Sequence, residues 1–224
     1  MNFEKVLSEA LPLLFEGVRL TIEISLLSLL IGVFVGLFSC LMGLSKNPVL
    51  KAISAFYVWV IRGTPMIVQA FVVYYGVPQL IQLIDPDFIL PVYTAGVITL
   101  CLNAGAYLSE IFRSGLEAVD PGQIEASRSL GISASKTMMK IVLPQAFKIT
   151  IPSLVNQFII TVKDTSILSV IGLSELVNKA KVYVGGTYRF FETYILVAVF
   201  YLVLISILMV ISKFVEKKFK YDKR

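Results

Sequence analysis

Long runs of apolar residues alternate with short polar connections along this chain. Crossing the hydrocarbon core of a bilayer as a helix takes about 20 mostly apolar residues. Five stretches are candidates for such spans, at residues 21–42, 52–76, 89–112, 147–162 and 193–212. The pattern therefore predicts an all-α, polytopic membrane protein with five transmembrane helices.

The same pattern divides the chain into one large unit and two short ends. Residues 1–20 carry three glutamates and no basic start typical of a signal peptide, so we expect a retained external segment. Residues 21–216 form a single predicted transmembrane domain. Residues 217–224 are rich in lysine and form a predicted cytoplasmic basic tail.

A polar stretch at residues 120–144 separates the third and fourth apolar runs. Its first half has the residues of a short, capped helix. Asp120 is suited to the N-cap, Pro121 to the first turn, and Gln123 to close a capping box with Asp120. Gly131 is suited to the left-handed residue that ends a helix.

A second short helix is predicted to follow directly. Ser133 can cap it, and Met138 and Met139 contribute to its apolar part. Pro144 lacks a backbone donor, so we expect a break there and a fourth span that begins near Phe147.

Composition and charge narrow the class of protein. The chain is 57% hydrophobic and 16% charged, which excludes an ordinary soluble domain. It has no His and only two Cys, Cys40 and Cys101, both inside apolar runs, so neither a metal site nor a disulfide is expected. The net charge of +5 does not indicate nucleic-acid binding, because the basic residues cluster at the predicted membrane edges.

The positions of Lys and Arg predict the orientation in the membrane. With the N-terminus outside, the connections that fall inside, together with the tail, hold most of the 20 Lys and Arg residues. Cytoplasmic loops are the ones enriched in these residues. We therefore expect the N-terminus outside, the C-terminus in the cytoplasm, and residues 120–144 on the cytoplasmic side.

Several polar residues lie within the predicted spans, where ionisable groups cost at least about 2.5 kcal/mol and often mark a transport route. Asn103 and Glu110 lie two turns apart on one face of the third span, and Glu110 could instead pair with Arg113. Thr64 precedes Pro65, where we expect the second span to break, either to line a cavity or to kink for packing.

Two further polar residues lie on the fourth span. Asn156 sits on a helical position that could face the same route, and Asp164 follows at the outer end of the span. Asp164 could form a local ion pair with Lys163 or meet a cationic substrate. We interpret Asn103, Asn156 and Asp164 as candidates for a weak amino-acid site in the pathway.

The polar stretch resembles the EAA loop of ABC importer permeases, the cytoplasmic coupling helix that docks on an ATPase subunit. The signature is Glu125-Ala126-Ser127, then Gly131, then Ile141-Val142-Leu143-Pro144, with Ser127 in place of the more usual Ala. Both residues are small, so we expect no loss of fit. The resemblance implies that the following residues couple to the motor: Glu125, Ala126, Ser127, Arg128, Gly131, Leu143 and Pro144.

Other segments are similar to polar amino acid permeases of the same superfamily, of the histidine, glutamine and arginine type. They are Tyr57–Pro65, Tyr107–Arg113 with Pro121–Gln123, Lys163–Ser166, and Glu175-Leu176. Together they imply the type I importer fold. They also imply a second permease chain, identical or homologous, two ATPase subunits, an external amino-acid-binding protein and a location in the bacterial inner membrane.

The residues are consistent with a transport subunit rather than an enzyme. The sequence has no phosphate-binding loop of the Walker type and no catalytic constellation, so ATP and Mg²⁺ are expected on a partner chain and no cofactor on this one. The function indicated is ATP-driven import of a polar amino acid, with basic amino acids among the candidates. The alternatives are import of another small solute by the same class of permease, or a secondary transporter without an ATPase.

Overall fold

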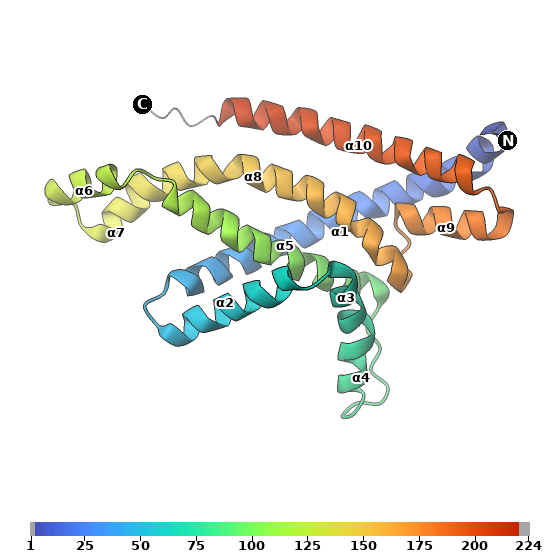
Figure 1. The fold of residues 1–224 in the computed structure, drawn as a ribbon, viewed down its shortest axis with the longest axis horizontal. Helices are drawn as coiled ribbons and strands as arrows, with labels where there is room; N and C mark the ends of the chain where they lie inside the picture. Colours follow the sequence, from blue (N-terminus) through green and yellow to red (C-terminus); the bar gives the residue numbers. More distant parts are fainter. Residues whose placement is uncertain (1–2, 220–224) are drawn as a thin grey trace.

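The computed structural model describes residues 3–219, and this part of the chain is helical, with no strand (Figure 1). The elements are α1 (Phe3–Leu44), α2 (Pro48–Gly63), α3 (Met66–Phe71), η1 (Val72–Gly76), α4 (Val77–Ile81), α5 (Val92–Glu117), α6 (Pro121–Ser129), α7 (Ala134–Thr137), η2 (Met138–Val142), α8 (Leu143–Asp164), η3 (Thr165–Ile171), α9 (Leu176–Thr187) and α10 (Phe190–Lys218). Here η1 and η2 are π-helices, and η3 is a 3₁₀ helix. Of the expected tail, residues 220–224 lie outside the described part, as do residues 1–2.

Within that part, four helical segments are long and apolar enough to cross a membrane: Phe3–Leu44, Val92–Glu117, Ala134–Ile171 and Phe190–Lys218. A fifth span is present if Pro48–Gly63 and Met66–Ile81, which meet at an angle of 108°, are counted as one broken span. The predicted all-α class is thereby confirmed, and the predicted number of five spans agrees with the structure when the broken pair is counted as one span.

The first helix is longer than the expected span at residues 21–42. α1 has 42 residues, about 63 Å of helix, which is twice the thickness of the hydrocarbon core. Its early turns bury Val6, Ala10 and Leu14, spaced by four residues, against Leu176 and other residues of α9 and α10. Residues 3–20 of the expected external segment are thus continuous with the first span, because this apolar stripe gives them a packing partner.

α1 and α5 approach closely through small residues. A Cβ added to Gly36 would lie 2.7 Å from the Cβ of Leu108 and 2.8 Å from the carbonyl oxygen of Gly105. Helix association in lipid relies on such packing of small residues. The structure therefore gives Gly32 and Gly36 the packing role that their four-residue spacing indicates.

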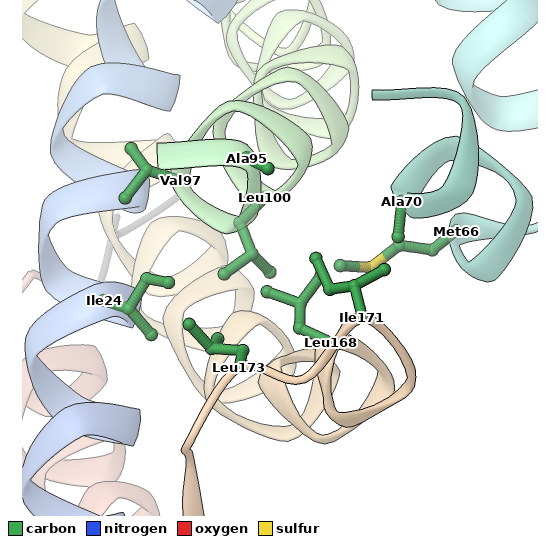
Figure 2. Packing of buried hydrophobic residues seen from close by; sticks show 9 residues of the cluster. All are labelled: Ile24, Met66, Ala70, Ala95, Val97, Leu100, Leu168, Ile171 and Leu173. Carbon is green, nitrogen blue, oxygen red and sulfur yellow. The ribbon is translucent and has the colours of Figure 1, made fainter. Parts of the chain in front are cut away.

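A buried apolar cluster joins α1, α3, α5 and η3 into one body. Figure 2 shows Leu100 and Leu168 between Ile24 on α1 and Met66 on α3, and each of these side chains is at most 9% exposed. The beginning of the second half of the broken span is therefore fixed to the core. The far end of this segment projects away from the bundle, and Leu80 is 67% exposed.

The expected break at Pro144 is wrong. Helical structure continues from Ala134 to Ile171, and Pro144 occupies the first turn of α8. The π-helix η2 comes directly before it, and such a wider turn accommodates an irregular pattern of backbone hydrogen bonds within a continuous helix. The fourth span is consequently longer at its N-terminal end than the predicted 147–162.

Candidate functional site

The helical hairpin of α6 and α7 lies at one end of the molecule, far from α9 and the N-terminus (Figure 1). Its local structure follows the predicted signals. The Asp120 carboxylate accepts a hydrogen bond from the amide of Gly122 at 2.8 Å. Gly131 has φ +77°, and the amides of Gly131 and Ile132 donate to the carbonyls of Arg128 and Ser127, which closes the helix as a Schellman motif.

Two side chains in the hairpin act differently from the expectation. Gln123 does not close a capping box; its side-chain oxygen accepts a hydrogen bond from the Gln145 amide on α8. Ser127 is 3% exposed and shares a hydrogen bond of 2.8 Å with the Thr137 hydroxyl on α7. The serine hydroxyl therefore adds a contact that an alanine would lack.

The outer face of α6 is left open to a partner. Glu125, Ala126 and Arg128 are exposed, and Leu130 beyond the helix is 81% exposed. Ile124 points the other way and packs on the small apolar cluster beneath the hairpin. The face thus presents an acid, a base and an apolar group on a rigid support. Leu143 and Pro144 are exposed nearby, at the beginning of α8.

The break between α2 and α3 has its own set of hydrogen bonds. Pro65 lacks the amide that would bond to the carbonyl of Ile61, four residues earlier. The side-chain amide of Gln69 donates to that carbonyl at 2.7 Å and to the carbonyl of Thr64 at 3.0 Å. The Gln69 oxygen accepts a hydrogen bond of 3.0 Å from Asn103 on α5. Gln69 therefore closes the broken turn and fixes it to α5, a role that the sequence did not predict.

A row of charged side chains lies beyond the break. Glu110 accepts from Arg113 at 2.9 Å, as the spacing predicted, and its carboxylate also lies 3.2 Å from the guanidinium of Arg62 on α2. Arg113 further pairs with Glu117 at 3.0 Å. We call these four side chains the charge ladder.

A cavity of about 470 Å³ opens beside the charge ladder, between α2, α5 and α8. Arg62, Tyr107 and Glu110 line one side. Ser153 and Gln157 of α8 line the other. Neutral and charged hydrogen-bonding groups thus face one another inside an otherwise apolar bundle.

The structure does not join all the predicted pathway residues. Asn103 and Thr64 both bond to Gln69, so these two meet at the break. Asn156 is exposed on α8, and Asp164 is half-buried at the end of that helix. Neither makes a hydrogen bond to Asn103 within residues 3–219, and the neighbour of Asn156 in the chain, Gln157, faces the cavity instead.

Glu175 lies buried at the opposite end of the molecule, outside the spans. Its carboxylate accepts from the amides of Val177 and Asn178 at 2.9 and 2.7 Å, and Tyr201 of α10 donates to it at 3.4 Å. Burial raises the pKa of this carboxyl to about 7. The glutamate therefore caps α9 and ties it to α10.

Metal ligands do not cluster anywhere in the described part of the chain: no three His, Cys, Asp or Glu residues there could hold an ion together. The polar groups that do cluster are the exposed face of α6, the hydrogen bonds around Gln69, and the charge ladder with its cavity. These features suit contact with a partner and passage of a small polar molecule.

Residues 28–221 match the family model of the inner membrane component of binding-protein-dependent transport systems. The chain belongs to this family. The arginine transport system permease protein ArtQ of Bacillus subtilis is 39% identical, with 94% of both chains covered. The glutamine transport system permease protein GlnP of Escherichia coli is 35% identical, again with 94% of both chains covered.

Solved structures agree with this assignment. A crystal structure of an amino acid ABC transporter with histidines superimposes with a TM-score of 0.90 at 38% identity, covering 97% of this chain and 99% of that one. The MetNI methionine ABC transporter in an inward-facing conformation gives a TM-score of 0.76 at 19% identity, covering 93% and 97%, and thus shares the fold. The type I permease fold and the inner-membrane family that the sequence resemblance implied are confirmed.

Proposed function

We propose that this chain is the permease subunit of an ATP-driven importer for a polar amino acid. The observation that carries the proposal is the open face of α6, which Ser127 and Gly131 hold in place at the end of a helical bundle. Family membership and the two permease relatives, named for arginine and glutamine, support the same function and the cargo class.

The proposed assembly has a second permease chain, identical or homologous, two ATPase subunits and an extracytoplasmic amino-acid-binding protein. ATP and Mg²⁺ bind to the ATPase subunits, and this chain is not itself an enzyme. Closed symmetry is the usual arrangement for such pairs of similar subunits. The substrate pathway then runs between the two permease chains.

The orientation proposed places the N-terminus outside and the C-terminus in the cytoplasm. The hairpin α6–α7, the connection from α1 to α2, and the C-terminal end of α10 lie at one end of the molecule, whereas the N-terminus and α9 lie at the other (Figure 1). The basic residues of the first end suit the cytoplasm. An ATPase would therefore reach α6 from inside.

The mechanism follows from two states with different contacts. ATP closes the ATPase dimer and moves the groove that holds α6. Because Val119, Val142 and Ala146 pack together beneath the hairpin, α5 and α8 move with it. The pathway opens outward to receive the amino acid from the binding protein, and hydrolysis returns it to the inward state.

The cargo site is proposed at the break and the adjoining polar surface. Thr64 and Asn103 lie at the break, Glu110 lines the cavity, and Asn156 and Asp164 lie along α8. The carboxylates among them favour a basic or neutral cargo over an acidic one. A small solute of another class remains the second candidate, because α6 contacts the motor and carries no information about cargo.

The test is co-purification of the chain with its ATPase, followed by ATP hydrolysis in liposomes with a panel of amino acids and a binding protein. The proposal expects arginine, glutamine or a related polar amino acid to stimulate hydrolysis and to accumulate. Asp164→Asn and Asn103→Ala are expected to raise the half-saturating cargo concentration. Uptake by this chain without any ATPase would refute the proposal.

A further inference from the structure

The charge ladder connects the two functional regions of the chain. Glu110, Arg113 and Glu117 occupy the last two turns of α5, and α5 leads through Val119 directly into α6. Arg62 is the penultimate residue of α2 and stands three positions before Pro65. The ladder therefore spans from the base of the coupling helix to the last turn before the break.

Arg62 has two partners on α5 rather than one. Its guanidinium lies 3.2 Å from the Glu110 carboxylate and 5.3 Å from the centre of the Tyr107 ring. Tyr107 and Glu110 are three residues apart, so they lie on one face of α5. A planar guanidinium can bond to the carboxylate and stack on the ring at the same time, which a lysine cannot do equally well.

The ladder is balanced in charge and only partly exposed. It has two arginines and two glutamates, and the Arg62 and Glu110 side chains are 43% and 32% exposed. Glu110 keeps Arg113 as a partner when Arg62 moves away, because Arg113 contacts both of its oxygens at 3.3 and 2.9 Å. Arg113 thus holds the Glu110 carboxylate in place on α5, where it can keep hold of Arg62 as α5 moves.

Resting on the proposed function, we propose that Arg62 is a positioning residue that transmits the motion of α6 to the helix break through Glu110. When α5 moves with the coupling helix, Glu110 and Tyr107 carry the end of α2 with them. The turn closed by Gln69, which Asn103 fixes to α5, then moves with α5 and alters the pathway at Thr64. Loss of the contact leaves the motor running while the break no longer follows it.

Charge exchange between the two helices tests this directly. The variants are Arg62→Glu and the double variant Arg62→Glu/Glu110→Arg, in the chain co-purified with its ATPase and binding protein in liposomes. Uptake of radiolabelled arginine and glutamine is measured together with ATP hydrolysis. Arg19→Glu is the matched control, because Arg19 is exposed on α1 and makes no ion pair among residues 3–219.

The single variant is expected to keep basal ATP hydrolysis within about twofold and to lower cargo transported per ATP by about tenfold. The double variant restores an opposite-charge pair between positions 62 and 110 and keeps the ladder neutral. It is therefore expected to recover most of that ratio for glutamine, a cargo without net charge that does not depend on the Glu110 carboxylate. A purely structural role would lower protein yield and hydrolysis together and leave the ratio unchanged.

Two results overturn the proposal: a wild-type ratio in Arg62→Glu, or a double variant that is no better coupled than the single one. If Arg62→Glu does not assemble, Arg62→Gln decides in the same assay, because it removes the charge and keeps hydrogen-bonding capacity. A lowered ratio there supports the proposal, and an unchanged ratio refutes it. Failure of the proposed function itself is distinguishable, because the wild-type complex would then show no ATP-dependent uptake.

Discussion

Replacing Gln69 tests the account of the helix break quantitatively. Gln69→Met keeps the length of the side chain but removes both its donor and its acceptor. The substitution leaves the Ile61 carbonyl without the donor that replaces the missing amide of Pro65, and it leaves the 7% exposed Asn103 without its acceptor. A buried polar group without a partner costs about 1–3 kcal/mol, and the more exposed carbonyl costs about 1 kcal/mol.

The expected total is therefore about 2–4 kcal/mol of unfolding free energy, which lowers the Tm by about 5–10 °C. The assay is thermal unfolding of the purified chain in detergent, with Asn103→Ala and the double variant Gln69→Met/Asn103→Ala alongside. The two substitutions remove the same hydrogen bond. The loss of stability in the double variant should therefore be smaller than the sum of the losses in the two single variants.

Gln79→Met is the control, because Gln79 is exposed on α4 and makes no side-chain hydrogen bond within residues 3–219; its effect should stay below about 0.5 kcal/mol. The reasoning fails if Gln69→Met unfolds at the wild-type temperature, or if the double variant shows fully additive losses.

Three further predictions concern the ends of the molecule. Gly131→Val places a β-branched residue at φ +77°, at a cost of about 1–3 kcal/mol. This variant should insert into the membrane but fail to transport, whereas the control Gly185→Val on α9 should transport normally. Ser127→Ala removes the bond to Thr137, costs about 1 kcal/mol and should release the α6–α7 hairpin to limited proteolysis; unchanged cleavage would count against the pairing. The Glu175 pKa is raised from 4.5 to about 7, so the contribution of this carboxyl to stability should be complete below pH 4.5 and fall by about 3 kcal/mol as pH rises through 7. Glu175→Gln should remove this part of the dependence of Tm on pH.

The sequence predicted those features that depend on neighbouring residues. Caps at Asp120 and Ser133, the left-handed Gly131 and the break before Pro65 each follow from a local steric or hydrogen-bonding rule, and all are present. The predictions at Pro144 and Gln123 were wrong because contacts and hydrogen bonds outside the local sequence decide the structure there. A π-turn absorbs the proline, and α8 supplies Gln123 with a competing partner.

Contacts between side chains on helices far apart in the chain could not be predicted from the sequence, for a physical reason. Arg62 lies on α2, whereas Glu110 lies on α5, beyond the whole of α3, η1 and α4 in the chain. Gln69 meets Asn103 only because the apolar core fixes α3 against α5. No periodicity along one helix indicates which face of another it will meet. One signal was available in retrospect: Pro65 leaves the Ile61 carbonyl without its partner, and Gln69 is the amide placed one turn later to replace it.

Cross-linking tests whether an ATPase subunit binds α6 on the cytoplasmic side of the membrane. Ala126→Cys on the exposed face of α6 is compared with Ser174→Cys, which is exposed near α9 at the opposite end of the molecule. The two native cysteines, Cys40 and Cys101, are buried and leave the background low. Ala126→Cys is expected to cross-link to the ATPase subunit in inverted vesicles and to be protected from impermeant thiol reagents in intact cells. Ser174→Cys is expected to be labelled by the same reagents from outside. Labelling of Ala126→Cys from outside intact cells, without any cross-link to the ATPase, would contradict it.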